Sequence, residues 1–165
     1  MEHGNLSPSG TIAPSMVIWR LNADITGDEL TAIGSAGSKW EIADDVSNEF
    51  YFGSATQVTE LSGIFTFGTL GYWNVRFYTF CRDTSTAGTH DVSMYSNSII
   101  VANRIMQAHA SGDHVSTAME VLLKVEDLGH TFKTTVNHSS DASGEMKGDT
   151  ADNETHLVFH KIGEI

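Results

Sequence analysis

Along most of this chain, hydrophobic and polar residues alternate with the two-residue period of β-strands. The clearest alternation covers residues 115–125, where β-branched and apolar side chains recur at every second position from Val115 onward. The positions between them, starting with His114 and Ser116, are mostly polar. This pattern predicts a strand with one face in the core and the other face toward solvent.

A second segment, residues 63–82, contains two apolar stretches joined by a corner between Gly68 and Gly71. In the later stretch both alternate sets of positions carry large aromatic residues. One set comprises Trp73, Val75, Phe77, Thr79 and Cys81, and the other comprises Tyr72, Asn74, Arg76, Tyr78 and Phe80. One set must fill the core, so the other is expected to meet another sheet or another subunit. Tyr72, Tyr78 and Phe80 are therefore candidate residues of a subunit interface.

Similar patterns, separated by segments rich in Gly, Ser, Asn and Asp, predict further strands at residues 16–21, 39–42, 50–52, 64–67, 90–95, 99–106, 131–138 and 155–162. Residues 55–61 fit either a strand or a turn, and residues 139–154 are expected to form an exposed polar loop. Because no segment has a convincing helical period, we predict an all-β sandwich of about ten strands. Strand spacing alone does not separate a jelly roll from an immunoglobulin-like sandwich, although the Cys…Trp…Cys pattern of the latter is absent.

The stretch from Gly63 onward resembles the signature of the jelly-roll superfamily of complement component 1q and tumour necrosis factor. The matching residues are Gly63, Phe65, Thr66, Gly71, Tyr72, Trp73, Val75 and Phe77, with weaker matches at Val92, Met94, Asn97, Thr155 and Ile162. The chain departs from the family at His130, where Asp usually follows the glycine. The resemblance implies an antiparallel jelly-roll sandwich of about ten strands that assembles as a homotrimer through aromatic and apolar strand faces.

The length of 165 residues fits one folded unit, which we divide into an N-terminal arm at 1–14 and a jelly-roll domain at 15–165. The net charge is -12 and Lys and Arg do not cluster, which argues against nucleic acid or an anionic membrane as a partner. The N-terminus lacks the pattern of a signal peptide, and no apolar run approaches the roughly 20 residues of a membrane span. Within the arm, the side chains able to bury surface on a partner are Leu6, Pro8, Ile12 and Pro14.

Candidate chemistry is sparse. His156 and His160 would share a strand face about 13 Å apart, too far to chelate one ion together. The acidic residues of 139–154 do not follow the calcium-loop pattern, so a solvated loop is favoured, although calcium binding stays open. No phosphate loop or nucleophile motif is present, and we expect neither an enzyme nor a cofactor.

Two hypotheses for function remain. The first is a virion structural protein: a trimeric jelly roll on the capsid surface, attached to the major capsid protein through Leu6, Pro8, Ile12 and Pro14 of the arm. The alternative is a binding module of the same fold, either the receptor-binding tip of a fibre or a secreted, extracellular ligand. A fold by itself does not choose between them, because function lies in sites that differ between proteins of one fold.

Overall fold

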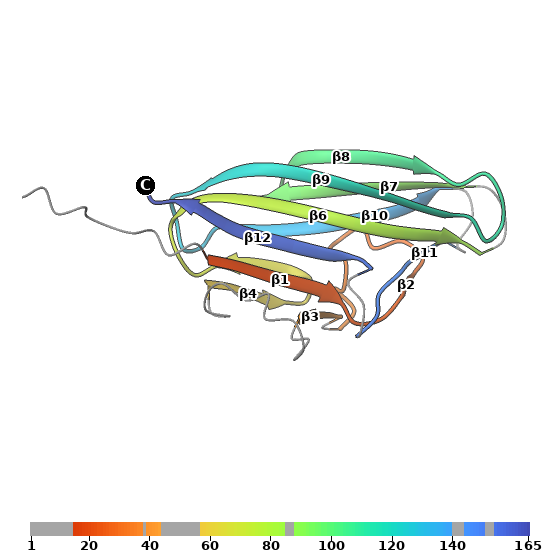
Figure 1. Ribbon diagram of the computed structural model, residues 1–165, viewed down its shortest axis with the longest axis horizontal. Coiled ribbons are helices and arrows are strands. Elements are labelled where there is room, and N and C mark those ends of the chain that lie inside the picture. Colours follow the sequence, from red (N-terminus) through yellow and green to blue (C-terminus); the bar gives the residue numbers. More distant parts are fainter. Residues whose placement is uncertain (1–14, 38, 44–56, 85–87, 140–143, 151–153) are drawn as a thin grey trace, which may run out of the picture.

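The computed structural model describes residues 15–37, 39–43, 57–84, 88–139, 144–150 and 154–165, which form two antiparallel β-sheets. The predicted strand at 50–52 and the proposed arm lie outside the described residues. The two sheets pack face to face as a jelly-roll β-sandwich, which confirms the predicted fold class. Figure 1 shows the long strands of the first sheet running side by side along the molecule.

The first sheet has a five-strand body in the order β3-β1-β12-β6-β9, and a short pair extends it beside the far end of β6 in the order β2-β11-β6. Its strands are β1 (Ser15–Leu21), β2 (Ile25–Thr26), β3 (Trp40–Ile42), β6 (Gly71–Asp83), β9 (His114–Val125), β11 (Gly144–Met146) and β12 (His156–Gly163).

The second sheet has the order β4-β5-β10-β7-β8. Its strands are β4 (Val58–Leu61), β5 (Ile64–Phe67), β7 (Thr89–Ser96), β8 (Ile99–Gln107) and β10 (Thr131–Ser139). Residues 58–61 thus form a strand, where the sequence left strand and turn open. The hairpin between β7 and β8 turns at Asn97 and Ser98, which both have positive φ.

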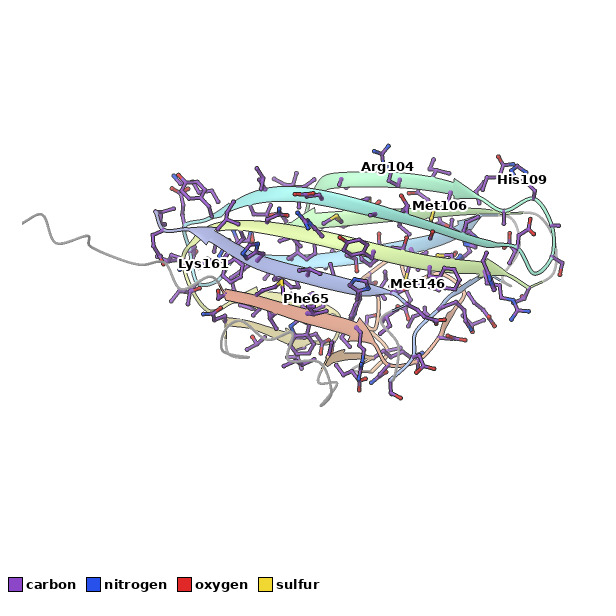
Figure 2. The ribbon with its side chains drawn as sticks, in the orientation of Figure 1. Phe65, Arg104, Met106, His109, Met146 and Lys161 are labelled. Atoms are coloured by element: carbon purple, nitrogen blue, oxygen red, sulfur yellow. The ribbon has the colours of Figure 1, made fainter. Side chains whose placement is uncertain are left out.

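Aromatic rings from both sheets fill the space between them. Phe159 of β12 lies 5.2 Å from Phe65, 5.8 Å from Phe67 and 5.6 Å from Phe132 between ring centroids. Phe65, labelled in Figure 2, also makes an edge contact with Trp19 of β1 at 5.8 Å. The inward set of β6, from Trp73 to Cys81, is buried. The prediction of which face of this strand fills the core is therefore confirmed.

Two glycines of the matched signature are needed for close backbone approach. Gly63 has φ +78, and a Cβ there would lie 2.3 Å from the carbonyl oxygen of Ile33. Gly71 has φ +142, and its Cβ would lie 2.4 Å from the carbonyl oxygen of Gly163. Both positions combine a left-handed backbone with space for a hydrogen atom alone. These glycines let the chain turn tightly into β5 and into β6.

The expectation of an exposed loop at 139–154 is wrong in part. Residues 144–146 form β11, and Met146 is fully buried against the core. The following Lys147 forms an ion pair with Asp24, and the Gly148 amide donates a hydrogen bond to the same carboxylate at 2.9 Å. A three-residue strand is too short to produce a visible alternation in sequence, and its partner β2 has only two residues.

The expectation that one face of β9 is almost purely core also needs correction. Met119, Leu123 and Val125 are buried, whereas Val115 and Val121 are only half-buried. The reason is the position of β9, because this strand pairs with β6 on one side and forms the edge of the body of the first sheet. An edge strand has fewer neighbours to cover its inward side chains.

Candidate subunit interface

The first sheet has an outer face that no other part of the described chain covers. The outward side chains of β6 include Tyr72, which is 43% exposed, and the half-buried Tyr78 and Phe80. The structure therefore places all three candidate interface residues on one face of one strand. Their role in an interface remains a prediction.

Strand register brings aromatic and imidazole rings together on this face. His156 of β12 is the register partner of Tyr78, and the two rings stack with centroids 4.5 Å apart. Across the other edge of β6, the ring of Phe80 lies 4.9 Å from that of His114 on β9. The histidine at 156 is therefore part of an aromatic platform, and it shares the outer face with His160, as the strand spacing predicted.

Aliphatic residues extend the platform on both sides. Val158 of β12 lies opposite Ile18 of β1, and both are half-buried. Leu122 of β9 is 68% exposed, and Ile162 near the end of β12 is 46% exposed. The sequence analysis did not predict these four residues as part of an interface. Leu122 could have been found, because it is an aliphatic residue on the otherwise polar side of its strand.

Several charged groups on the outer face are paired within the subunit. Asn74 donates a hydrogen bond to Glu120 Oε1 at 2.6 Å, and the guanidinium of Arg76 lies 3.4 Å from Glu120 Oε2. At the side of the sheet, Arg20 donates to Glu41 at 2.8 Å. A partner that covers this face thus does not need to supply opposite charges to these residues.

Shallow hollows lie beside the same strands. One of about 310 Å³ is bounded by Tyr78, Ala118 and Glu120, where the small side chain of Ala118 stands next to the tyrosine ring. A second of about 560 Å³ lies between β8 and β9, next to Asn103 and Arg104. Both are open depressions that can receive side chains from a neighbouring molecule.

The structure adds little support for the other sites predicted from the sequence. The attachment residues Leu6, Pro8, Ile12 and Pro14 lie outside the described residues, as do parts of the acidic segment 139–154. In the ranges that are described, no group of three or more His, Cys, Asp or Glu side chains is arranged to hold a metal ion. No helix in the described part of the chain is long and apolar enough to cross a membrane.

Comparison with known proteins identifies the fold. No family model matches the chain, and no curated protein matches it. Among solved structures, murine APRIL at pH 5.0 has a TM-score of 0.59 with 11% identity and covers 90% of this chain and 99% of its own. Eiger TNF from S. frugiperda has a TM-score of 0.58 with 10% identity, and covers 93% of this chain and 95% of its own. Murine APRIL at pH 8.5 gives a TM-score of 0.55 at 11% identity, with the same coverage as the pH 5.0 structure.

Strand order and these likenesses together define an antiparallel jelly-roll protein. More specifically, the chain has a tumour necrosis factor-like fold, in agreement with the resemblance in residues 63–77. At this level of identity the likeness concerns the fold alone. It gives no support for a phage or viral origin.

Proposed function

We propose that this protein is a non-enzymatic module that works as a homotrimer, assembled through the outer face of the first sheet. The observation that carries the proposal is the aromatic and aliphatic platform around Tyr78, Val158 and Leu122. Leaving such a patch in water is unfavourable, since apolar surface gains about 25 cal/mol per Å² on burial. The number of subunits follows from the family resemblance, which implies three.

A closed ring of three requires two different patches on each subunit, because its interfaces are heterologous. The outer face provides the first patch. The edge formed by β8 and β9 is suited to be the second, because Ile99 is 69% exposed and Ile105 is 67% exposed there. The hollow between these strands gives that edge a shape into which a neighbour's side chains can fit.

Light scattering on the purified protein tests the assembly. We expect three times the chain mass of 17.9 kDa for the full chain, and the mass of a monomer for Leu122→Asp. The matched control is Leu128→Asp, because Leu128 is 56% exposed and lies in the turn after β9, outside the strands of the first sheet. A monomeric wild-type protein at micromolar concentration would contradict the proposal, as would a trimeric Leu122→Asp protein.

Within this class, the first specific role is a capsid decoration protein, bound to a major capsid protein through residues 1–14. Two features of the sequence support it: the acidic surface implied by a net charge of -12, and the single cysteine in place of a disulfide framework. Deleting residues 2–14 is expected to leave a folded trimer that no longer binds the particle. Decoration of capsids by the truncated trimer at undiminished affinity would exclude attachment through the arm.

A second role is an extracellular ligand or the receptor-binding tip of a fibre. The observation that favours it is the likeness of the fold to Eiger TNF. The two roles differ in where the protein is found. A fixed number of copies in purified particles supports the capsid role, whereas soluble trimers that bind a cell surface support the second.

A further inference from the structure

Three ionisable side chains are buried between the two sheets where β6 and β10 end and β7 begins. His90 is 0% exposed, and His138 and Asp83 are each 5% exposed. Figure 1 shows that this end of the sandwich lies opposite the C-terminus, and Figure 2 labels Met106 and Met146 near it. Burying a titratable group is costly unless its partners are arranged to satisfy it, so this cluster requires an explanation.

The two imidazoles face each other across paired strands. His138 of β10 is the register partner of His90 of β7, and the rings meet edge to face with centroids 4.8 Å apart. Their Nδ1 atoms are 2.6 Å apart. On its other side, His90 Nε2 lies 3.6 Å from Asp83 Oδ1. The three groups therefore lie in a row, with a hydrogen bond between the two rings and a longer electrostatic contact between His90 Nε2 and the carboxylate. His90 Nε2 has no hydrogen-bond partner among the described residues.

This arrangement favours one tautomer of each imidazole ring. The Asp83 carboxylate favours a proton on His90 Nε2, because a ring lone pair facing a carboxylate is repelled. A neutral His90 then has a bare Nδ1, which accepts a hydrogen bond from the Nδ1–H of His138. This leaves His138 Nε2 bare, and it has no hydrogen-bond partner among the described residues. The cluster is thus arranged for two neutral rings.

A proton added to either ring has an unfavourable position. On His138 it occupies Nε2, a buried atom without a described acceptor. On His90 it occupies Nδ1, so that two N–H groups would point at each other across 2.6 Å. Burial, followed by the nearby His90, lowers the pKa of His138 to about 4, while Asp28 and Asp83 act in the opposite direction. Burial likewise lowers the pKa of His90, against the effect of Asp83.

The groups that face the pair come from every element around it. β6 contributes the Asp83 carboxylate. Two residues earlier on the same inward face lies the Cys81 thiol, which is neutral because burial, followed by the Asp83 charge, raises its pKa to about 12. The segment after β2 contributes Asp28, whose Oδ1 accepts a hydrogen bond from the His138 backbone amide at 2.6 Å. In β8 the register partner of His90 is the uncharged Met106.

The last neighbour is β11, which lies directly against the ring of His138. Gly144 approaches so closely that a Cβ there would be 2.4 Å from His138 Nδ1. The charged side chain of this strand, Glu145, lies 3.7 Å from Lys147. The ring of His138 therefore contacts β7 and β11, and its own amide binds Asp28, so its position affects three segments at once.

We propose that His90 and His138 form an acid-operated latch, which closes this end of the sandwich while both rings are neutral and opens it when they gain protons. Opening separates the ends of β7 and β10 and releases β11 and the Asp28 segment. The aromatic core around Phe159 lies between other parts of the strands and holds the remaining sandwich together. This inference does not depend on the proposed function.

A zinc site does not fit the same geometry. Two imidazole nitrogens bound to one tetrahedral zinc ion are about 3.4 Å apart, given Zn–N bonds of about 2.1 Å. The observed separation of the Nδ1 atoms is 2.6 Å, which corresponds to a direct hydrogen bond.

The expected size of the effect follows from proton linkage. The pKa of the His138 imidazole is at its ordinary value of 6.5 when the latch is open, and is lowered to about 4 when the latch is closed. The closed state therefore has its full stability above pH 6.5, and it loses stability as the pH falls from 6.5 toward 4, because the open state takes up the proton first. Between pH 7 and pH 5, the opening equilibrium constant is expected to rise about twentyfold from this one proton.

Amide hydrogen exchange on the full chain tests the latch. The reporter is the His138 amide, which donates to Asp28. After correction for the intrinsic rate, its protection should fall about twentyfold between pH 7 and pH 5 in the wild type. In His138→Gln, which cannot be protonated, the fall should disappear at the amide of residue 138. In the control His109→Gln it should persist, since His109 is exposed in the loop after β8.

If His138→Gln does not fold, the proposal can still be tested by titrating the imidazole rings of the wild-type protein directly. Imidazole resonances from nitrogen-labelled histidine should show His138 still neutral at pH 5.5 while the protein remains folded. Protonation of His138 near its ordinary value, without loss of amide protection, would overturn the proposal. So would a His138→Gln protein that loses protection with acid as the wild type does.

Discussion

The rings of Tyr78 and His156 stack on the solvent-facing side of the first sheet, with their planes 13° apart. Stacking across the β6–β12 pair holds both side chains in place before any partner arrives. Ordering a side chain on association costs about 0.5–1.5 kcal/mol, so an ordered platform binds with less opposing entropy. This relationship is a local reason to locate the centre of a subunit interface at these two residues.

Removing the tyrosine ring should weaken assembly. Tyr78→Ser is expected to make association less favourable by about 2 kcal/mol per interface, as is typical of a buried aromatic residue at an interface centre. Sedimentation at several protein concentrations measures the change. Tyr95→Ser is the control, because Tyr95 is half-buried on β7 in the other sheet. Equal weakening by the two substitutions would contradict the assignment of the outer face.

Phe65 and Ile64 test which face of β5 lies inside. Phe65 is fully buried, whereas the adjacent Ile64 is 41% exposed. Phe65→Ala should reduce the free energy of unfolding by about 3–5 kcal/mol, because it leaves a cavity among aromatic rings. Ile64→Ala should cost less than about 1 kcal/mol. Denaturant titration of both variants measures the difference, and similar losses would show that the strand is placed with the wrong face inward.

Substitution of two glycines by alanine can distinguish the cost of a left-handed backbone from the cost of a steric clash. Gly63 and Gly112 both have positive φ, but a Cβ at Gly112 meets nothing within 4 Å, whereas one at Gly63 meets the Ile33 carbonyl oxygen. Gly112→Ala should therefore cost only the strain of a left-handed residue, about 1–2 kcal/mol. Gly63→Ala should cost clearly more. Thermal unfolding of the two variants measures this difference, and equal costs would mean that the backbone near Ile33 moves without penalty.

The fold was predictable because its strands are long and their alternation is strong. The two sets of residues in β6 gave both the core and the outer face, and Gly68 and Gly71 marked the corner between β5 and β6. Short elements were not predictable, since β2 and β11 contain two and three residues and only their pairing with each other and with β6 makes them strands. The exposure of edge strand β9 also depends on sheet order, which alternation does not reveal.

The candidate interface was predictable only within a single strand. Tyr72, Tyr78 and Phe80 were found because they share one face of β6, but Ile18, Val158 and Leu122 come from three other strands. Their meeting depends on register, which sequence alone leaves undetermined. The same is true of His90 and His138, which lie 48 positions apart in the sequence and become neighbours through the β7–β10 pair.

Cys81 provides a chemical test of how the far end of the sandwich is packed. The thiol is fully buried, and burial, followed by the Asp83 charge, raises its pKa to about 12. Since the thiolate is the reactive form, Cys81 should resist alkylation in the folded protein near pH 8 and react completely in denaturant. Mass spectrometry after timed exposure to iodoacetamide measures both.

The substitution Met146→Ala extends this test to β11, because Met146 is the register partner of Cys81 and is fully buried. Shortening it should cost about 2–5 kcal/mol and speed alkylation of the thiol, since the cover provided by β11 is weakened. Leu30→Ala is the control, because Leu30 is 63% exposed and its loss should leave the alkylation rate unchanged. Rapid alkylation of Cys81 in the folded wild type would show instead that this end of the sandwich is already open at neutral pH.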